Sequence, residues 1–231
     1  YQENFTNGVG FSLSAGFIYK PTNTFRFGLS YQSPTWFREI IENTNIINND
    51  GFFGDTEIEV SNSDVIYNNT FGGNLPIQEL LYKLRTPSKI TASTAIIFGK
   101  FGLISFDYST NNYKGLYLSG DDFSQENLFF DNQLRRADAM RFGTEWRINN
   151  LSVRGGYVFE QSPFINSISS DNLESYSLGL GYNFGNVKLN LSYRKSNKTD
   201  QYDFYPQYSE VEATQLNINN TIITIGFSAN I

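Results

Sequence analysis

The feature that most constrains this chain is an alternation of apolar and polar residues, which returns at every second position in one segment after another. In the segment 8–20 the apolar positions are Val9, Phe11, Leu13, Ala15, Phe17 and Tyr19. Successive side chains of a β-strand point to opposite faces, so this period of two predicts strands with one apolar and one polar face. Apolar residues at helical spacing are almost absent. The alternation therefore predicts an all-β protein.

Breaks in the alternation divide the chain into about nine strands. We expect the strands at residues 8–20, 24–33, 82–98, 101–109, 138–148, 151–159, 173–184, 187–195 and 212–231. The connections between them are of two kinds. Short connections, which contain the Gly and Asn that adopt the positive φ of tight hairpin turns, lie at 21–23, 99–100, 149–150 and 185–186. Long connections, rich in Asn, Asp, Ser and Gly, lie at about 33–79, 110–136, 160–172 and 196–211.

The sorting of these connections points to a membrane protein. Short turns at one end of an up-and-down sheet and long polar loops at the other are typical of bacterial outer-membrane barrels. A soluble β-sandwich or solenoid would alternate as well. The aromatic residues favour the barrel, because many lie near the ends of the expected strands, where an interfacial girdle would be. These residues are Tyr19, Phe25, Tyr31, Phe98, Phe101, Tyr108, Trp146, Tyr157, Phe159, Tyr182, Phe184 and Tyr193. The sequence thus predicts a transmembrane antiparallel up-and-down β-barrel.

Strand direction indicates how such a barrel is completed. The first expected strand runs toward the short turn at 21–23, and the last runs from a long loop to Ile231. Bacterial barrels have an even number of strands, so an odd number should precede the first strand here. We therefore expect residues 1–231 to be the C-terminal part of one larger barrel domain. Residues 34–81 are expected to form a long extracellular loop region.

Composition excludes several classes of function. The chain has no Cys and no His, which removes disulfide scaffolds, Cys/His zinc sites, thiol catalysis and imidazole bases. A Ser nucleophile would need Lys as its base, and no Ser-x-x-Lys stands in a suitable context. The formal net charge of −6 argues against a nucleic-acid partner. We expect a protein that is not an enzyme and has neither a cofactor nor a metal site.

Several segments resemble one family of outer-membrane proteins. MRFGTEWRINNLSVRGGY at 140–157, FEQSPF at 159–164 and YSLGLGYNFGNVKLNLSY at 176–193 are similar to the last part of FadL-type transporters of long-chain fatty acids and other hydrophobic compounds. FRFGLSYQSPTWF at 25–37 and TPSKITASTAIIFGKFGLISFDYS at 86–109 resemble the branch of this family found in Bacteroidetes-type bacteria. The ordered set of segments spans almost the whole chain.

The resemblance implies a 14-stranded barrel in the bacterial outer membrane, plugged by a small N-terminal hatch. The hatch and the first strands would lie outside this chain. Short turns would be periplasmic and long loops extracellular, with outer-membrane lipids and a hydrophobic small molecule as partners. The implied function is passive uptake of long-chain fatty acids or other hydrophobic molecules. The alternative is a FadL-like barrel that binds or delivers a protein partner at its extracellular loops, as the PorV component of type IX secretion does.

Two sets of residues are candidates for ligand contact. The first set is too apolar for a solvated loop and would line a capture site, and it comprises Trp36, Phe37, Ile40, Ile41, Phe52 and Phe53. Alternatively, these residues pack the loop onto the barrel rim, or belong to extensions of the strands. The second set lies on the polar face by alternation and would receive a ligand carboxylate, and it comprises Arg26, Arg141, Arg147, Arg154 and Lys188. Glu145 and Glu160 share that face, so a ladder of salt bridges that also holds the hatch is the other interpretation.

Overall fold

A computed structural model describes residues 2–46, 58–59, 66–67, 78–120, 123–202 and 213–229. These residues form two large antiparallel sheets, one of nine strands and one of four. A two-residue pair, β5 (Ile58–Glu59) with β6 (Ile66–Tyr67), forms a third. One α-helix, α1 (Ser124–Gln133), and two 3-10 turns, η2 (Tyr113–Gly115) and η3 (Ser169–Asp171), complete the described part of the chain. No helix within these ranges is long and apolar enough to cross a membrane.

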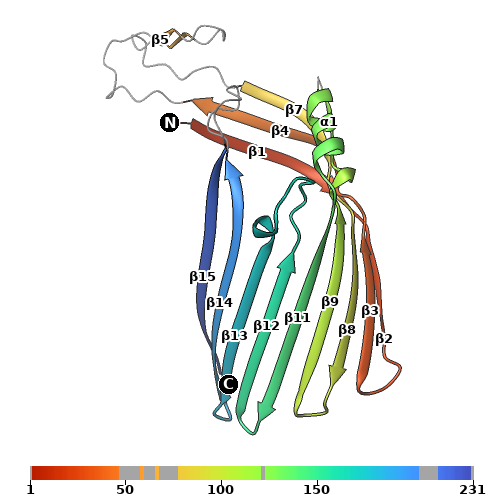
Figure 1. The fold of residues 1–231 in the computed structure, drawn as a ribbon, viewed down its shortest axis with the longest axis vertical. Helices are drawn as coiled ribbons and strands as arrows, with labels where there is room; N and C mark the ends of the chain where they lie inside the picture. The colour runs from red at the N-terminus through yellow and green to blue at the C-terminus, as the bar shows by residue number, and fades with distance from the viewer. Residues whose placement is uncertain are drawn as a thin grey trace.

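The nine-stranded sheet, which we call the wall, follows the order of the chain. Its strands are β2 (Ser14–Tyr19), β3 (Phe25–Gln32), β8 (Lys89–Ile97), β9 (Gly102–Asn112), β11 (Arg136–Ile148), β12 (Leu151–Glu160), β13 (Leu173–Asn183), β14 (Val187–Tyr202) and β15 (Thr214–Ala229). All neighbours are antiparallel, and the sheet curves like a section of a barrel (Figure 1). Among the described strands, the edges β2 and β15 have one neighbour each. The predicted up-and-down all-β fold is confirmed.

Tight turns join neighbouring strands at one end of the wall, which we call the turn end. Gly99, Asn149 and Gly185 have φ angles of 57°, 53° and 98°, respectively. All three lie in connections that the sequence predicted as tight turns. Left-handed backbone favours Gly and Asn, which is why the chain reverses at these residues. The opposite end, the loop end, carries α1 and the four-stranded sheet (Figure 1).

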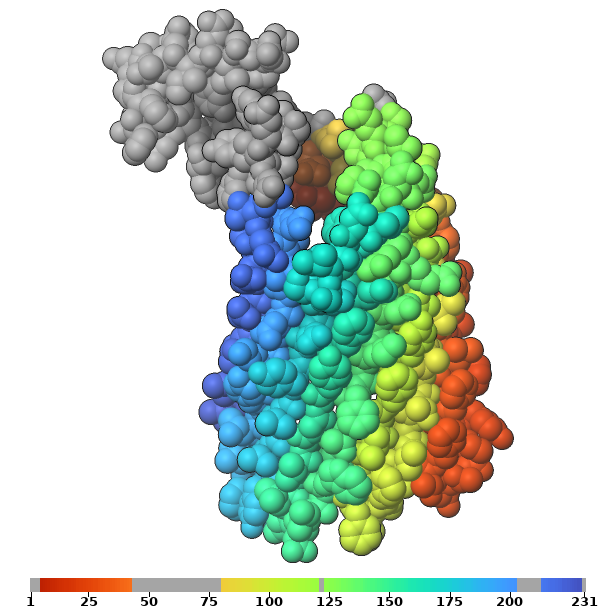
Figure 2. Space-filling view, in the orientation of Figure 1, coloured from red at the N-terminus to blue at the C-terminus, as the bar shows by residue number. Residues whose placement is uncertain are grey.

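One face of the wall, the outer face, is apolar from strand to strand. Phe142 pairs with Phe106 on one side and Tyr157 on the other, and Tyr157 pairs with Tyr176. Nearer the turn end, the rings of Phe98 and Trp146 stack with their centroids 5.3 Å apart. The side chains of neighbouring strands form a continuous surface in the space-filling view, with α1 projecting above it at the loop end (Figure 2).

The apolar residues are on the outside of the described structure, not in a core. Leu178 is 64% exposed and Ile225 is 73% exposed. Within the described ranges, the buried apolar residues are Ile40, Leu134, Ala137 and Ala139. A soluble sandwich would bury its apolar faces against each other, so this distribution fits a sheet whose outer face lies in hydrocarbon.

The four-stranded sheet, which we call the upper sheet, continues four strands of the wall. It contains β1 (Gln2–Phe11), β4 (Trp36–Ile46), β7 (Gln78–Arg85) and β10 (Tyr117–Gly120), in the order β1-β4-β7-β10. These strands adjoin β2, β3, β8 and β9 along the chain, across short breaks at 12–13, 33–35, 86–88 and 113–116. The upper sheet lies at a steep angle to the wall (Figure 1). Four successive strands therefore bend at the same level.

Hydroxyl side chains hold these bends. Pro34 and Pro87 have no N–H to donate to a ladder. Ser33 Oγ accepts a hydrogen bond from the backbone N–H of Leu13 at 2.9 Å, and Thr86 Oγ1 accepts one from the N–H of Thr35 at 2.9 Å. The side chains replace backbone acceptors where the sheet turns, which keeps buried backbone groups paired.

The upper sheet also accounts for differences from the sequence analysis. The region 34–81, expected as a loop, contains β4 and the first residues of β7, in line with the strand-extension alternative. The single strand expected at 82–98 is two strands, β7 and β8, separated at the segment that holds Pro87. The loop expected at 110–136 contains β10 and α1.

Candidate functional site

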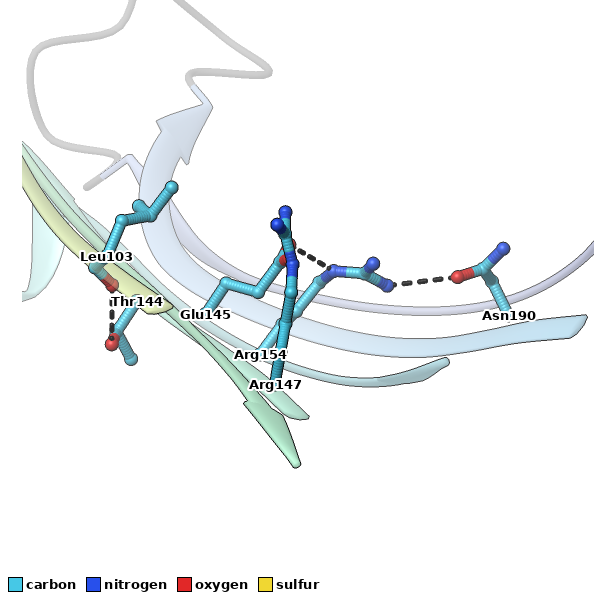
Figure 3. Close-up of polar contacts among 6 residues, drawn as sticks. All are labelled: Leu103, Thr144, Glu145, Arg147, Arg154 and Asn190. Atoms are coloured by element: carbon cyan, nitrogen blue, oxygen red, sulfur yellow. Dashed lines mark hydrogen bonds and ion pairs between the residues drawn. The ribbon is translucent and has the colours of Figure 1, made fainter. Parts of the chain in front are cut away.

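A network of charged residues lies on the concave face of the wall near the turn end (Figure 3). Glu145 of β11 accepts hydrogen bonds from Arg147 Nε at 2.6 Å and from Arg154 Nε at 2.7 Å. Arg154 Nη1 also donates to Asn190 Oδ1 of β14 at 3.0 Å. The Glu145 side chain is 19% exposed, whereas that of Arg154 is 41% exposed. One carboxylate thus holds two guanidinium groups in place.

A glycine gives Arg154 the room to cross a strand. Arg154 lies on β12 and Asn190 on β14, with β13 between them. A Cβ on Gly181 of β13 would lie 2.7 Å from Asn190 Oδ1 and 3.1 Å from Arg154 Nη1. Any side chain there would displace the contact. On the other face of β11, the Thr144 hydroxyl donates to the Leu103 carbonyl at 3.1 Å.

The network borders a polar pocket of about 370 Å³, which we call the turn-end pocket. Its lining residues are Glu145, Arg147, Asn149, Asn150, Ser152, Arg154, Gly181, Tyr182, Asn183, Lys188 and Asn190. Three cations and one carboxylate are among them. The Lys188 side chain makes no hydrogen bond or ion pair within the described part of the chain. The pocket therefore carries an excess of positive charge.

A second and larger pocket, of about 630 Å³, lies at the loop end, and we call it the loop-end pocket. Its lining residues are Tyr113, Phe129, Gln133, Glu160, Gln161, Ser162, Pro163, Phe164, Asn166, Ser167, Asp171, Leu173, Lys198, Thr199, Asp200 and Gln201. Its volume falls within the roughly 300–1,000 Å³ usual for small-molecule sites. Aromatic and aliphatic side chains form part of the lining, so the pocket can hold an apolar body.

Helix α1 positions the aromatic part of this pocket. The rings of Phe129 and Phe164 approach edge to face, with centroids 6.5 Å apart. Asn127, two residues earlier, accepts a hydrogen bond from Leu118 N–H at 2.9 Å and donates one to the Leu118 carbonyl at 2.8 Å. The side-chain amide of Asn127 thus bonds to the backbone of β10 as a neighbouring strand would. These bonds fix the helix to the upper sheet. Leu128, Ile165 and Ile168, which are close to Phe129 and Phe164 in sequence, are also exposed, and we call these three residues the apolar rim.

The connection between β12 and β13 is equally well fixed. Arg135 Nε donates to the Ser162 carbonyl at 3.2 Å, and Arg135 Nη2 donates to Ser167 Oγ at 2.9 Å. The Ser162 N–H donates to Asn172 Oδ1 at 2.9 Å. Thr199 Oγ1 of β14 donates to Asp171 Oδ1 at 2.7 Å. The loop-end pocket is therefore built from segments that hold one another.

Of the predicted apolar set, the described residues divide between the two faces of the upper sheet. Phe37 and Ile40 lie over Gly10 and Gly8 of β1, and Ile40 is only 5% exposed. Register places Trp36 and Ile41 on the opposite face of β4, with a bulge between them. These placements fit packing within the sheet for Phe37 and Ile40. Phe52 and Phe53 lie outside the described residues.

Beside Ile40, the face that it shares with Phe37 carries the half-buried phenol of Tyr82. Tyr82 Oη donates a hydrogen bond to Glu42 Oε2 at 3.2 Å, and the Tyr82 ring lies 5.7 Å from that of Phe123. Burial, together with this bond, raises the pKa of Tyr82 above its usual value. The phenol therefore remains a neutral donor to Glu42.

Strand register places all five predicted cations on the concave face. Arg147, Arg154 and Lys188 meet at the turn-end pocket. Arg141 lies toward the loop end, where it pairs with Glu160 and donates to the buried Ser109 hydroxyl at 3.3 Å. Arg26, on β3, joins neither the turn-end pocket nor the pair of Arg141 with Glu160. The five cations thus do not converge on one point.

The aromatic residues of the loop-end pocket are in neither set of ligand-contact residues that the sequence predicted. Phe129 and Phe164 lie in segments that were expected to be polar connections. The local signals were an apolar triplet, Leu128 to Phe130, and the run Pro163, Phe164 and Ile165. Neither signal shows that the two segments meet, because they are 35 residues apart in sequence and join only through the fold.

Comparison with solved structures identifies the fold. This chain is similar to the CymD monoaromatic hydrocarbon channel (17% identity, TM-score 0.51), with coverage of 96% of this chain and 51% of that one. A FadL homologue of Pseudomonas aeruginosa is similar at 13% identity and a TM-score of 0.60, covering 94% of this chain and 51% of that one. The toluene transporter TodX of Pseudomonas putida is similar at 14% identity and a TM-score of 0.51, covering 97% of this chain and 50% of that one.

These comparisons establish a FadL-type barrel fold for the described wall. The chain spans about half the length of each solved structure. No protein-family model matches the sequence, and no curated protein matches it.

Proposed function

We propose that this chain forms the wall and the ligand pockets of an outer-membrane channel for passive uptake of hydrophobic small molecules. One observation carries the proposal: a partly apolar pocket, with exposed apolar residues nearby in the chain, lies at the loop end of a wall whose outer face is apolar. The outer face requires a lipid environment, and the pocket offers a place to hold an apolar molecule. Outer-membrane lipids and a hydrophobic ligand are the partners that this arrangement fits.

Orientation follows from the two ends. In outer-membrane barrels the short turns are periplasmic and the long loops are extracellular. The loop-end pocket would then meet ligand first, and the turn-end pocket would lie near the periplasm. Two of the similar solved structures are a hydrocarbon channel and a toluene transporter, which also favours transport over catalysis.

The wall would be closed by further strands of the full-length protein. Edge strands facing lipid without partners would leave backbone groups unpaired, at several kcal/mol for each exposed group. The similar solved chains are about twice as long as this one. We infer a barrel of about 14 strands with an N-terminal hatch, as the FadL-type fold implies.

Uptake measurements test the proposal. The full-length protein is produced in a bacterium that lacks its own such transporter, and initial uptake of oleate and of oleyl alcohol is compared with a vector control. Replacing Phe129 and Phe164 by Ser should lower uptake at least about tenfold, because a fully buried ring is worth about 1.5–3 kcal/mol and the variant removes two rings that are each about half buried. The matched control is Phe101→Ser, which changes an exposed ring at the turn end. Normal uptake by a correctly folded double variant would remove the loop-end pocket from the path.

The same experiment addresses the alternative function, binding or delivery of a protein partner. A channel raises uptake of at least one probe above the vector control. A folded protein that raises uptake of neither probe is not a channel for these molecules. In that case the apolar rim at Leu128, Ile165 and Ile168 would be tested as a surface for a protein.

A further inference from the structure

We infer that the loop-end pocket selects uncharged hydrophobic molecules and discriminates against those that carry a carboxylate. This inference rests on the proposed function and narrows it to a substrate class. Three observations support it. The lining of the loop-end pocket is acidic, the cations near it are already paired, and the turn-end pocket has the opposite charge.

The lining of the loop-end pocket contains more acidic than basic groups. Glu160, Asp171 and Asp200 contribute three carboxylates, and Lys198 contributes one ammonium group. The formal charge of the lining is therefore one minus three, or −2. A ligand carboxylate would enter beside groups of its own sign, and like charges at short range repel one another.

The cations around this pocket already have partners. Lys198 Nζ pairs with Asp200 Oδ2 at 3.1 Å. Arg141 pairs with Glu160, and Arg135 donates to the Ser162 carbonyl and to Ser167. A ligand carboxylate would have to compete with Asp200 or Glu160 for an existing cation. No additional cation of the described structure lines the pocket to receive it.

The remaining lining suits an uncharged molecule. Phe129, Pro163, Phe164 and Leu173 offer apolar surface. The amide groups of the Gln and Asn residues and the hydroxyl groups of the Ser residues offer neutral donors and acceptors. Such a lining can hold a hydrocarbon, or an alcohol whose hydroxyl finds one hydrogen bond. It needs no counter-ion in either case.

The turn-end pocket has the opposite balance. Arg147, Arg154 and Lys188 face Glu145 alone, so that its formal charge is three minus one, or +2. The surplus of cations therefore lies at the other end of the wall from the aromatic lining. A carboxylate would be favoured near the turns and disfavoured where capture begins.

Photolabelling with a matched pair of ligands tests this inference. The full-length protein, in its native outer membrane, is exposed to an 18-carbon alcohol and to the 18-carbon acid, each with a diazirine at the same carbon. Labelled residues are mapped by mass spectrometry. At equal free concentrations, the alcohol should label the segments around Phe129 and Phe164 about fivefold more than the acid, as expected for about 1 kcal/mol of charge discrimination.

A charge variant provides the converse measurement. Asp200→Lys frees Lys198 and adds a second cation, so labelling by the acid should rise about fivefold. Labelling by the alcohol should stay unchanged. The matched control is Asp131→Lys, which changes the net charge equally on an exposed residue of α1 that does not line the pocket.

The outcomes separate the inference from the proposed function. Equal or stronger labelling of the pocket by the acid would overturn the inference while uptake stands. So would uptake of both ligands with labels confined to other segments. Uptake of neither ligand would overturn the proposed function, and the inference with it.

Discussion

At the scale of single residues, Glu145 is the residue on which the concave network depends, because it accepts from both Arg147 and Arg154. Glu145→Gln removes the charge that holds these two guanidinium groups side by side. We expect the free energy of unfolding in lipid bilayers to fall by about 1 kcal/mol, a modest loss because both arginines are well exposed. Urea titration of the folded barrel measures it. Glu174→Gln, an exposed carboxylate of β13 that has no ion pair with any described residue, is the control.

If Glu145→Gln and Glu174→Gln had the same effect, the network would contribute nothing to stability. Its predicted role in ligand binding would then be the more interesting one. A change in uptake of oleate, with uptake of oleyl alcohol unchanged, would support that role, because the substitution raises the formal charge of the turn-end pocket from +2 to +3.

Sequence alone could assign the faces of the charged residues but not their contacts. Alternation places Arg154 and Lys188 on the same face of the wall because strand side chains have a period of two. The contact between Arg154 and Asn190 spans three strands, and it depends on the missing side chain of Gly181. A glycine in a strand indicates a close approach, but not which residue approaches. The contacts of the network could therefore be identified only from the folded structure.

At the scale of elements, the bends between the wall and the upper sheet depend on two hydroxyl groups. Replacing Ser33 and Thr86 by Ala would leave the backbone N–H groups of Leu13 and Thr35 without their acceptors. Each loss should cost about 1 kcal/mol and should loosen the upper sheet relative to the wall. Hydrogen exchange of these two amides should quicken about fivefold for each kcal/mol lost.

The control for the bends is Thr91→Ala, a hydroxyl of β8 whose side chain has no hydrogen bond among the described residues. Amides in the centre of β11 and β12 should exchange at the same rate in all variants. Uniform acceleration across the wall would mean that the hydroxyl groups stabilise the whole barrel and not the bends.

The limits of the sequence prediction are also clear at this scale. The wall strands were found because their outer faces need apolar residues at every second position. In β4 the register shifts between Phe37 and Ile40, and this bulge breaks the alternation that would have revealed the strand. Strand β14 extends to Tyr202, beyond the expected end at residue 195, through a polar stretch with no apolar face to show it. Elements that contact water and one another leave weaker patterns than elements in lipid.

At the scale of the whole molecule, the described structure reverses the usual distribution of residues. Its large apolar side chains are exposed on the outer face, and its ion pairs lie on the concave face. A chain with only 39% apolar residues can form such a structure because strands satisfy backbone hydrogen bonds between neighbours and need apolar residues on one face only. The low apolar content that would weaken a soluble core is therefore sufficient here.

Two neighbouring residues of β14 can test this reversal directly. Leu191 pairs with Leu180 and Ile225 on the outer face, and Ser192 pairs with Gly179 and Thr224 on the concave face. Leu191→Arg should lower the free energy of unfolding in bilayers by up to about 2–4 kcal/mol, the cost of a cation in hydrocarbon. Ser192→Arg, one position along the same strand, should change it by less than about 1 kcal/mol, because its side chain points to water.

The pair is informative because both variants add the same side chain to the same strand. Differences in expression, net charge and strand propensity therefore cancel, and only the face differs. Folded fractions are read from the electrophoretic mobility of unheated samples, and free energies from urea titration in bilayers. If the two variants were equally destabilised in bilayers, both faces of the wall would have similar surroundings. The wall would then belong to a soluble protein, and the membrane channel proposed here would have to be abandoned.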